Sequence, residues 1–210
     1  GVTTPIRRAA TVLLVRDAPK QSESVRDAPV DHLQVWMMHR IAALNFAAGA
    51  HVFPGGAVED GDSVALADVP SDLDGVDIAT LSPAMGLPPA EAAAVVRAAV
   101  REIHEEADVR LNPAGLVPWA WWLTPDHIPV RYDTWFFLYD ARAGIAPEHI
   151  DGGEAVTARW WGVNEALTAN RHGSIMLLWP TLLELLALSS TRSVDEALNQ
   201  RPQQLQRRSG

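Results

Sequence analysis

The sequence predicts an α/β fold in which several strands are interspersed with a few helices. Apolar runs of strand length, rich in β-branched and aromatic residues, recur from the N-terminus to about residue 162. One long amphipathic segment and two shorter apolar segments near the C-terminus have helical periodicity instead. This alternation favours a mixed sheet held between helices.

Length and composition limit the possible functions. The 210 residues suit a single domain, 1–210, and the chain lacks cysteine, which excludes disulfides and thiolate metal sites. A net charge of −9 argues against nucleic acid or an anionic membrane as the partner. No apolar run is long enough to span a bilayer. We therefore expect a cytoplasmic protein that acts on a small molecule.

The strands and the shorter helices follow from local patterns. Strands are predicted at Ala9–Val15, Leu33–His39, Val117–Leu123, Trp135–Tyr139 and Thr157–Gly162. Asn164 is a predicted cap for a short helix, Glu165–Asn170. A helical extension over residues 171–200 contains predicted helices at Pro180–Leu188 and Val194–Gln200, and Arg201–Gly210 is a predicted frayed tail. The apolar Ile175–Leu188 segment covers the core or forms a homodimer interface; the pattern leaves both open.

The long helix predicted at Glu91–Val109 carries an arrangement that helix stability does not select. Glu102, Glu105 and Glu106 lie on one arc, where like charges repel and the helix dipole disfavours anions. Such a cluster becomes favourable around a hard cation such as Mg²⁺ or Mn²⁺. The alternative is a solvated acidic face in which Arg101 pairs with Glu105. The helix alone does not decide between the two.

The glycine-rich stretch before this helix adds a second part of a motif. Gly56, an acid at Asp62 and the segment Arg101–Val109 together resemble the Nudix box, G-x5-E-x7-R-E-U-x-E-E-x-G-U, where U is aliphatic. The sequence departs from the box at Asp62, which replaces Glu, and at Asp108, which replaces Gly and tolerates the left-handed conformation that closes a helix. The gap between Asp62 and Arg101 is 38 residues instead of seven. We interpret Ser63–Ala90 as a surface insertion within the box.

One branch of the family has such an insertion. Gly49–Gly56, GAHVFPGG, resembles a stretch of the coenzyme A diphosphatases related to the animal peroxisomal enzyme. A wider pattern associated with coenzyme A, R-[SA]-x3-R-x3-G-x3-F-P-G-G, matches at Arg40, Gly49 and Phe53–Gly56. The sequence departs from that pattern at Ile41 and Asn45.

The resemblance implies an α/β/α Nudix sandwich and hydrolysis of a nucleoside diphosphate linked to another group, with Mg²⁺ or Mn²⁺ as cofactor. The implied substrate is coenzyme A or acyl-coenzyme A, giving 3′,5′-ADP and a phosphopantetheine product. The alternatives are NADH, ADP-ribose or a nucleotide sugar, or a nucleotide-sensing protein without turnover. The implied metal ligands are the Gly55 carbonyl, Glu102, Glu105 and Glu106.

The remaining site residues are assigned as follows. Glu105 and Arg101 are predicted catalytic residues, Arg101 by holding the glutamates in place. Glu154 is the first choice for the general base and Glu148 the second. His51 either contacts the substrate or fixes the backbone, and Arg131 either reaches a phosphate or pairs with Asp133. The predicted substrate-binding residues are Arg40, Gly49, His51, Gly56 and Arg131.

Overall fold

The computed structural model describes residues 5–20, 30–40, 49–64, 73, 75–151 and 156–210. The chain divides into two compact units. The first comprises Gly1–Leu13, Pro54–Tyr139 and Arg201–Gly210, and the second Leu14–Phe53 and Asp140–Gln200. Strands β1 (Arg7–Asp17) and β6 (Tyr132–Asp140) contribute residues to both units.

The strands of the first unit form both antiparallel and parallel pairs. The start of β1 pairs antiparallel with the short strand β4 (Gly55–Ala57), with Thr11 opposite Gly55. Strand β5 (Val117–Leu123) pairs antiparallel with β6, and β10 (Arg207–Ser209) adds to β5 in parallel. A 3₁₀ turn, η1 (Asp60–Asp62), follows β4, and a second one, η3 (Pro113–Gly115), comes just before β5.

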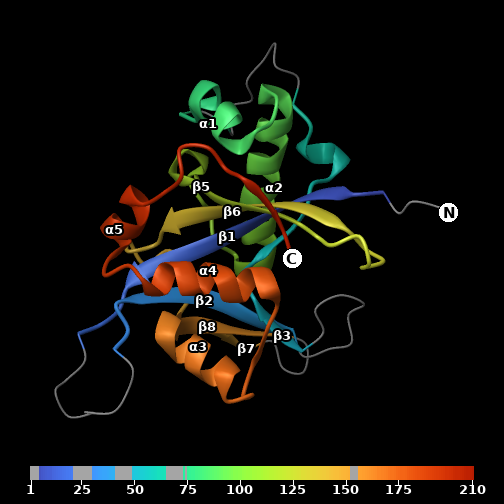
Figure 1. The fold of residues 1–210 in the computed structure, drawn as a ribbon. Coiled ribbons are helices and arrows are strands. Elements are labelled where there is room, and N and C mark those ends of the chain that lie inside the picture. The colour runs from blue at the N-terminus through green and yellow to red at the C-terminus, as the bar shows by residue number, and fades with distance from the viewer. Residues whose placement is uncertain (1–4, 21–29, 41–48, 65–72, 74, 152–155) are drawn as a thin grey trace. The chain divides into compact units, whose positions relative to one another are not determined.

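Two helices of the first unit pack against each other, α1 (Ile78–Met85) and α2 (Pro89–Ala107) (Figure 1). Helix α2 buries one alanine- and valine-rich face, and a proline occupies its first turn, where no amide partner is needed. It ends at Asp108, whose φ of 54° is the only left-handed value at a non-glycine among the described residues. The predicted long helix and its Asp108 ending are confirmed.

In the second unit, β2 (Leu33–Arg40) pairs with three strands. It lies antiparallel to the end of β1, to β3 (Ala50–Val52) and to β8 (Val156–Gly162). Strand β7 (His149–Asp151) pairs with β8, and β9 (Met176–Leu177) pairs in parallel with β3. Helix α3 (Val163–Arg171) packs against α4 (Trp179–Ser189) and β8, and α5 (Val194–Asn199) follows.

The predicted α/β class, with mixed strand pairing and helices, is confirmed. All five predicted strands are present, and so are the helices of the C-terminal extension. No helix in the described part of the chain is long and apolar enough to cross a membrane.

Three local predictions were wrong. Asn164 does not cap α3: Gly162 is the N-cap, and the Asn164 amide donates to Asp31 Oδ1 at 2.6 Å. The tail is not frayed, because Arg207–Ser209 forms β10 and Leu205 is buried, with its amide donating to the Ala84 carbonyl at 2.8 Å. The insertion is not only a surface loop, since its described residues form α1 and bury Met85.

Candidate active site

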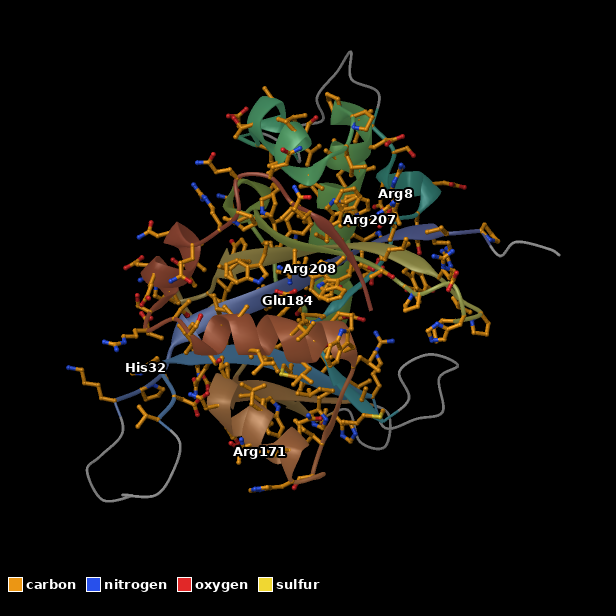
Figure 2. All side chains as sticks on the ribbon, in the orientation of Figure 1. Arg8, His32, Arg171, Glu184, Arg207 and Arg208 are labelled. Atoms are coloured by element: carbon orange, nitrogen blue, oxygen red, sulfur yellow. The ribbon has the colours of Figure 1, made fainter. Side chains whose placement is uncertain are left out.

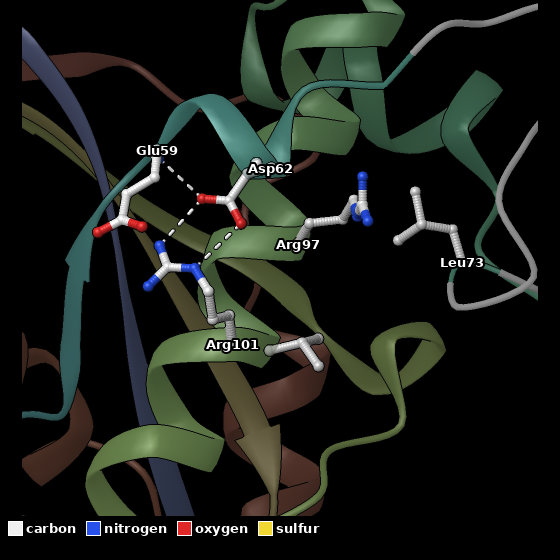
Figure 3. A pocket seen from close by; sticks show the side chains of 7 residues that line it. Glu59, Asp62, Leu73, Arg97 and Arg101 are labelled. Carbon is white, nitrogen blue, oxygen red and sulfur yellow. Dashed lines mark hydrogen bonds and ion pairs between the residues drawn. The ribbon is translucent and has the colours of Figure 1, made fainter.

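The site in the first unit is organised by the Arg101 side chain, which α2 directs toward η1 (Figure 3). Its Nε donates to Asp62 Oδ1 at 3.1 Å and its Nη2 to Asp62 Oδ2 at 2.9 Å. The same Nη2 donates to the Ala57 carbonyl at 2.9 Å. Arg101 thus ties α2 to both β4 and η1 in a two-pronged arrangement that guanidinium geometry favours.

The remaining Arg101 nitrogen is directed to the glutamates. Nη1 donates to Glu102 Oε1 at 2.8 Å and reaches Glu105 Oε2 at 3.5 Å. Hydrogen bonds to Asp62, and then to Glu102, hold the pKa of Arg101 above its ordinary value despite partial burial. Arg101 therefore stays charged and fixes Glu102, as the sequence predicts for a residue that holds the glutamates.

Asp62 is a candidate site residue whose role was not assigned from the sequence. Its side chain is 5% exposed, and its Oδ2 also accepts the Glu59 amide at 2.8 Å. One carboxylate thus closes η1 and anchors Arg101. The sequence contains a signal for this contact, because an acid three residues after Glu59 has the spacing at which a side chain reaches back to the start of a helical turn.

The glycine loop lies directly against two of the three glutamates. The Gly55 amide donates to Glu106 Oε2 at 3.0 Å. A Cβ at Gly56 would collide with the Glu102 carboxylate, whereas a Cβ at Gly55 would collide with the backbone of Ala10 and Thr11. Close approach of β4 to β1 therefore requires glycine at position 55, whereas glycine at position 56 leaves room for the Glu102 carboxylate where it now lies.

Glu105 is held least. Its side chain is 58% exposed, against 13% for Glu102. Among the described residues, no three acidic or histidine side chains are already gathered as a metal cluster. The structure thus brings Gly55, Gly56, Arg101, Glu102 and Glu106 together, with Glu105 on the exposed side of the same helix face.

A cavity of about 250 Å³ adjoins the Arg101–Asp62 pair (Figure 3). Leu73 from the insertion and Arg97 from α2 line it together with Glu59 and Arg101. Arg97 Nη1 donates to the Ser63 carbonyl at 3.2 Å. The insertion therefore supplies part of the wall next to the arginine anchor.

Three predicted substrate-binding residues belong to the second unit. The Gly49 amide donates to the Arg40 carbonyl at 2.8 Å, and Gly49 has a φ of 77°. His51 on β3 pairs with His39 on β2, and its ring is buried. The structure thus places Arg40, Gly49 and His51 around the β2–β3 pair.

Arg131 belongs to the first unit and does not pair with Asp133. Its Nε donates to the Thr124 carbonyl at 3.0 Å, while Asp133 accepts the Trp121 indole at 2.7 Å. Asp133 also lies 3.6 Å from Arg207 of β10. Asp133 therefore has its partners on β5 and β10, and Arg131 bonds instead to Thr124, the residue after β5.

The two candidates for the general base are Glu154 and Glu148. Glu154 lies outside the described residues, as do Ile41 and Asn45. Glu148 accepts two hydrogen bonds from Arg16, at 2.7 and 3.1 Å, and these lower the pKa of its carboxyl. A carboxylate stabilised in this way is a weaker base, which argues against Glu148.

Solved structures with a similar fold are Nudix proteins. No protein-family model matches the sequence, and no curated protein sequence matches it. A Nudix hydrolase from Alicyclobacillus acidocaldarius superposes with a TM-score of 0.70 at 22% identity, covering 95% of this chain and 98% of that chain. A MutT Nudix hydrolase from Burkholderia pseudomallei has a TM-score of 0.50 at 16% identity, covering 89% and 99%.

A third similar structure includes a metal and a nucleotide. It is a bifunctional NMN adenylyltransferase/ADP-ribose pyrophosphatase from Francisella tularensis, complexed with AMP and a manganese ion. Its TM-score is 0.50 at 14% identity, covering 90% of this chain and 42% of that chain. From its strand pairing, its helices and these superpositions, this chain has the fold of the Nudix hydrolases.

Proposed function

We propose that this chain is a metal-dependent Nudix hydrolase that splits a nucleoside diphosphate linked to another moiety. One observation carries the proposal: Glu102 and Glu106 of α2 lie against the Gly55–Gly56 backbone, with Arg101 anchored to Asp62 behind them. Like charges on neighbouring turns of one helix face repel, so helix stability alone does not select this set of carboxylates.

The donor set suits a hard divalent cation. Carboxylate and carbonyl oxygens are the ligands that Mg²⁺ and Mn²⁺ take, and the Gly55 carbonyl, Glu102, Glu105 and Glu106 would hold the ion. Because these groups are not yet clustered, ligation requires side-chain rotation, which the exposure of Glu105 permits. When bound, such an ion neutralises diphosphate charge and makes a bound water easier to deprotonate.

The protein residues have separate parts in this proposal. Arg101 is a positioning residue, because its contacts are to Asp62, Ala57 and Glu102. Glu105, which is also a proposed metal ligand, and Glu154 are the proposed catalytic residues, and Glu154 would accept the proton of the attacking water. Arg40, Gly49, His51, Gly56 and Arg131 are proposed to bind the substrate.

For the substrate we propose coenzyme A or acyl-coenzyme A, cleaved to 3′,5′-ADP and a phosphopantetheine product. Support comes from the match at Arg40, Gly49 and Phe53–Gly56 to the coenzyme A pattern. ADP-ribose is the second candidate, because the manganese-containing Francisella structure includes an ADP-ribose pyrophosphatase.

The experiment is a product assay on purified protein with Mg²⁺ or Mn²⁺. Coenzyme A, acetyl-coenzyme A, NADH, ADP-ribose and UDP-glucose are incubated separately, and products are resolved by chromatography. We expect metal-dependent 3′,5′-ADP from coenzyme A. Turnover of another compound would keep the mechanism and change the substrate, and no turnover with either metal would favour the sensing alternative.

Substitutions in α2 test whether the activity arises at the proposed metal site. Glu105→Gln and Glu106→Gln should each lower kcat at least about a hundredfold, equivalent to about 2.7 kcal/mol. Glu91→Gln, at the other end of α2 where Glu91 pairs with Arg8, is the matched control and should leave the rate within about twofold. Equal rates in all three variants would contradict the metal-site assignment.

A further inference from the structure

The second unit contains a cavity of about 210 Å³ between β2, β3, β7 and β8. Its polar lining comes from His39, His51, His149, Thr157 and Arg159, and the rest of its wall is apolar or aromatic. Every one of these polar side chains can donate a hydrogen bond, and no carboxylate is among the lining residues that the structure describes. The lining therefore suits a ligand that accepts hydrogen bonds.

His51 is the buried member of this set. Its side chain stacks on His39, with ring centroids 4.3 Å apart, and meets Trp161 edge-on at 5.2 Å. The residue is 8% exposed, and its Nδ1 is buried with no hydrogen-bond partner within the described part of the chain. Nε2 has no hydrogen bond to a described residue either, but unlike Nδ1 it is not buried.

These contacts select one tautomer of His51. Burial, followed by the charges of His39 and Arg159, lowers the pKa of His51 to about 4, so its ring carries a single proton near pH 7. A proton on Nδ1 would be a buried donor without an acceptor, which is costly. The proton therefore belongs on Nε2, the accessible nitrogen, where it forms a donor available to a ligand.

Among the described lining residues, Arg159 carries the permanent charge, and that charge is positive. Arg159 lies over the Trp161 ring at 3.5 Å from the guanidinium carbon, and its Nη2 donates to Glu165 of α3 at 2.8 Å. Glu165 offsets part of the charge from outside the lining, yet Arg159 still disfavours a proton on His51. A field that disfavours a cation at His51 favours an anion in the cavity.

We propose that this cavity binds a small oxyanion, a phosphate or carboxylate carried on an apolar body, with His51 Nε2–H as a hydrogen-bond donor. The apolar and aromatic walls accommodate the body of the ligand, and the donors face its oxygens. A volume below the roughly 300–1,000 Å³ of drug-sized sites suits one ring with its charged group. His51 is also among the residues proposed above to bind the diphosphate substrate, but binding in this cavity requires neither a metal nor turnover and can be measured apart from hydrolysis.

Binding is tested by calorimetry at pH 7.5 with a chelator present, which keeps turnover out of the measurement. Phenyl phosphate, benzoate and phenol share one ring and differ in the attached group. We expect saturable binding of phenyl phosphate, benzoate or both, and at least about tenfold weaker binding of phenol. Stronger binding of the phosphate or of the carboxylate identifies which oxyanion the cavity prefers. Absence of binding by both anions, or equal binding of phenol, overturns the proposal.

Paired variants test the role of the Nε2–H group. His51→Gln keeps a donor near the Nε2 position and should retain affinity within about threefold, whereas His51→Leu should lose at least about tenfold. His127→Gln, which removes an exposed histidine of the first unit, is the control for altered histidine content. Unchanged affinity in His51→Leu overturns the assignment. If that variant does not fold, the ¹⁵N shift of wild-type His51 Nε2 decides, since an unchanged shift at ligand saturation also overturns it.

Discussion

The two adjacent glycines of β4, Gly55 and Gly56, both lack room for a Cβ, but different parts of the protein fill the space. At Gly56 the obstacle to a Cβ is the end of the Glu102 side chain, which can rotate away. At Gly55 the obstacle is the backbone of β1, which cannot. Identical substitutions at neighbouring positions should therefore change different properties.

Gly56→Ala should lower kcat by about tenfold or more because it displaces Glu102, while the melting temperature changes little. Gly55→Ala should lower the free energy of unfolding by about 1–3 kcal/mol, because the strand itself must shift. Thermal unfolding and the product assay, run on both variants, check this. A large loss of stability in Gly56→Ala with normal activity would contradict the prediction.

His51 makes the stability of the protein depend on pH. Its pKa in the folded protein, about 4, lies below the ordinary value of 6.5, so between these values the unfolded chain binds more protons. The contribution to the free energy of unfolding is complete above about pH 6.5 and falls with pH through this window, by at most about 1.4 kcal/mol per unit.

Urea unfolding from pH 4.5 to 7.5 measures this dependence. Wild-type protein should lose more stability on acidification than His51→Gln, which has no titrating ring. His127→Gln should follow the wild type. Parallel curves for all three proteins would show that His51 is not responsible.

At the scale of single elements, strong local patterns were predictable and long-range partners were not. Strand β5 and helix α2 were recognised from their periodicity, and Asp108 from the conformation that a helix end requires. Helix α1 was missed because it is short and contains Pro83. The cap of α3 was misassigned because Asp31, which accepts the Asn164 amide, is distant in sequence. The Nudix box located Arg101 and the glutamates, but only the fold shows that Asp62 anchors Arg101.

Strand β10 could not be predicted because its residues are polar and its stability depends on the open edge of β5. Arg207 and Arg208 lie over the rings of Trp121 and Trp122, at 5.3 and 5.6 Å (Figure 2). These cation–π contacts are accompanied by backbone pairing in parallel with β5. Polar residues thus form a strand because β5 already offers an edge for backbone pairing and aromatic rings for the arginines.

Removing residues 207–210 should lower the melting temperature by several degrees and increase aggregation, since the edge of β5 would be uncovered. The double variant Arg207→Ala, Arg208→Ala keeps the backbone pairing and should show a smaller loss. Thermal unfolding and light scattering compare the two. Equal effects would assign the stabilisation to the side chains instead.

At the scale of the whole molecule, the two units are assembled from interleaved segments. Strand β1 passes from one unit to the other between Leu13 and Leu14, and β6 does so after Tyr139. Because shared strands connect their hydrogen bonding, we expect one cooperative thermal transition, with equal calorimetric and van't Hoff enthalpies. Two resolved transitions in calorimetry would show that the units unfold separately.

The late position of β10 has a consequence for synthesis. At about 5–20 residues per second, the segment between β5 and β10 takes on the order of ten seconds to be translated. Throughout that interval the β5 edge, with its tryptophans, has no covering strand from its own chain. The nascent protein is therefore most open to pairing with a neighbouring chain just before β10 is made.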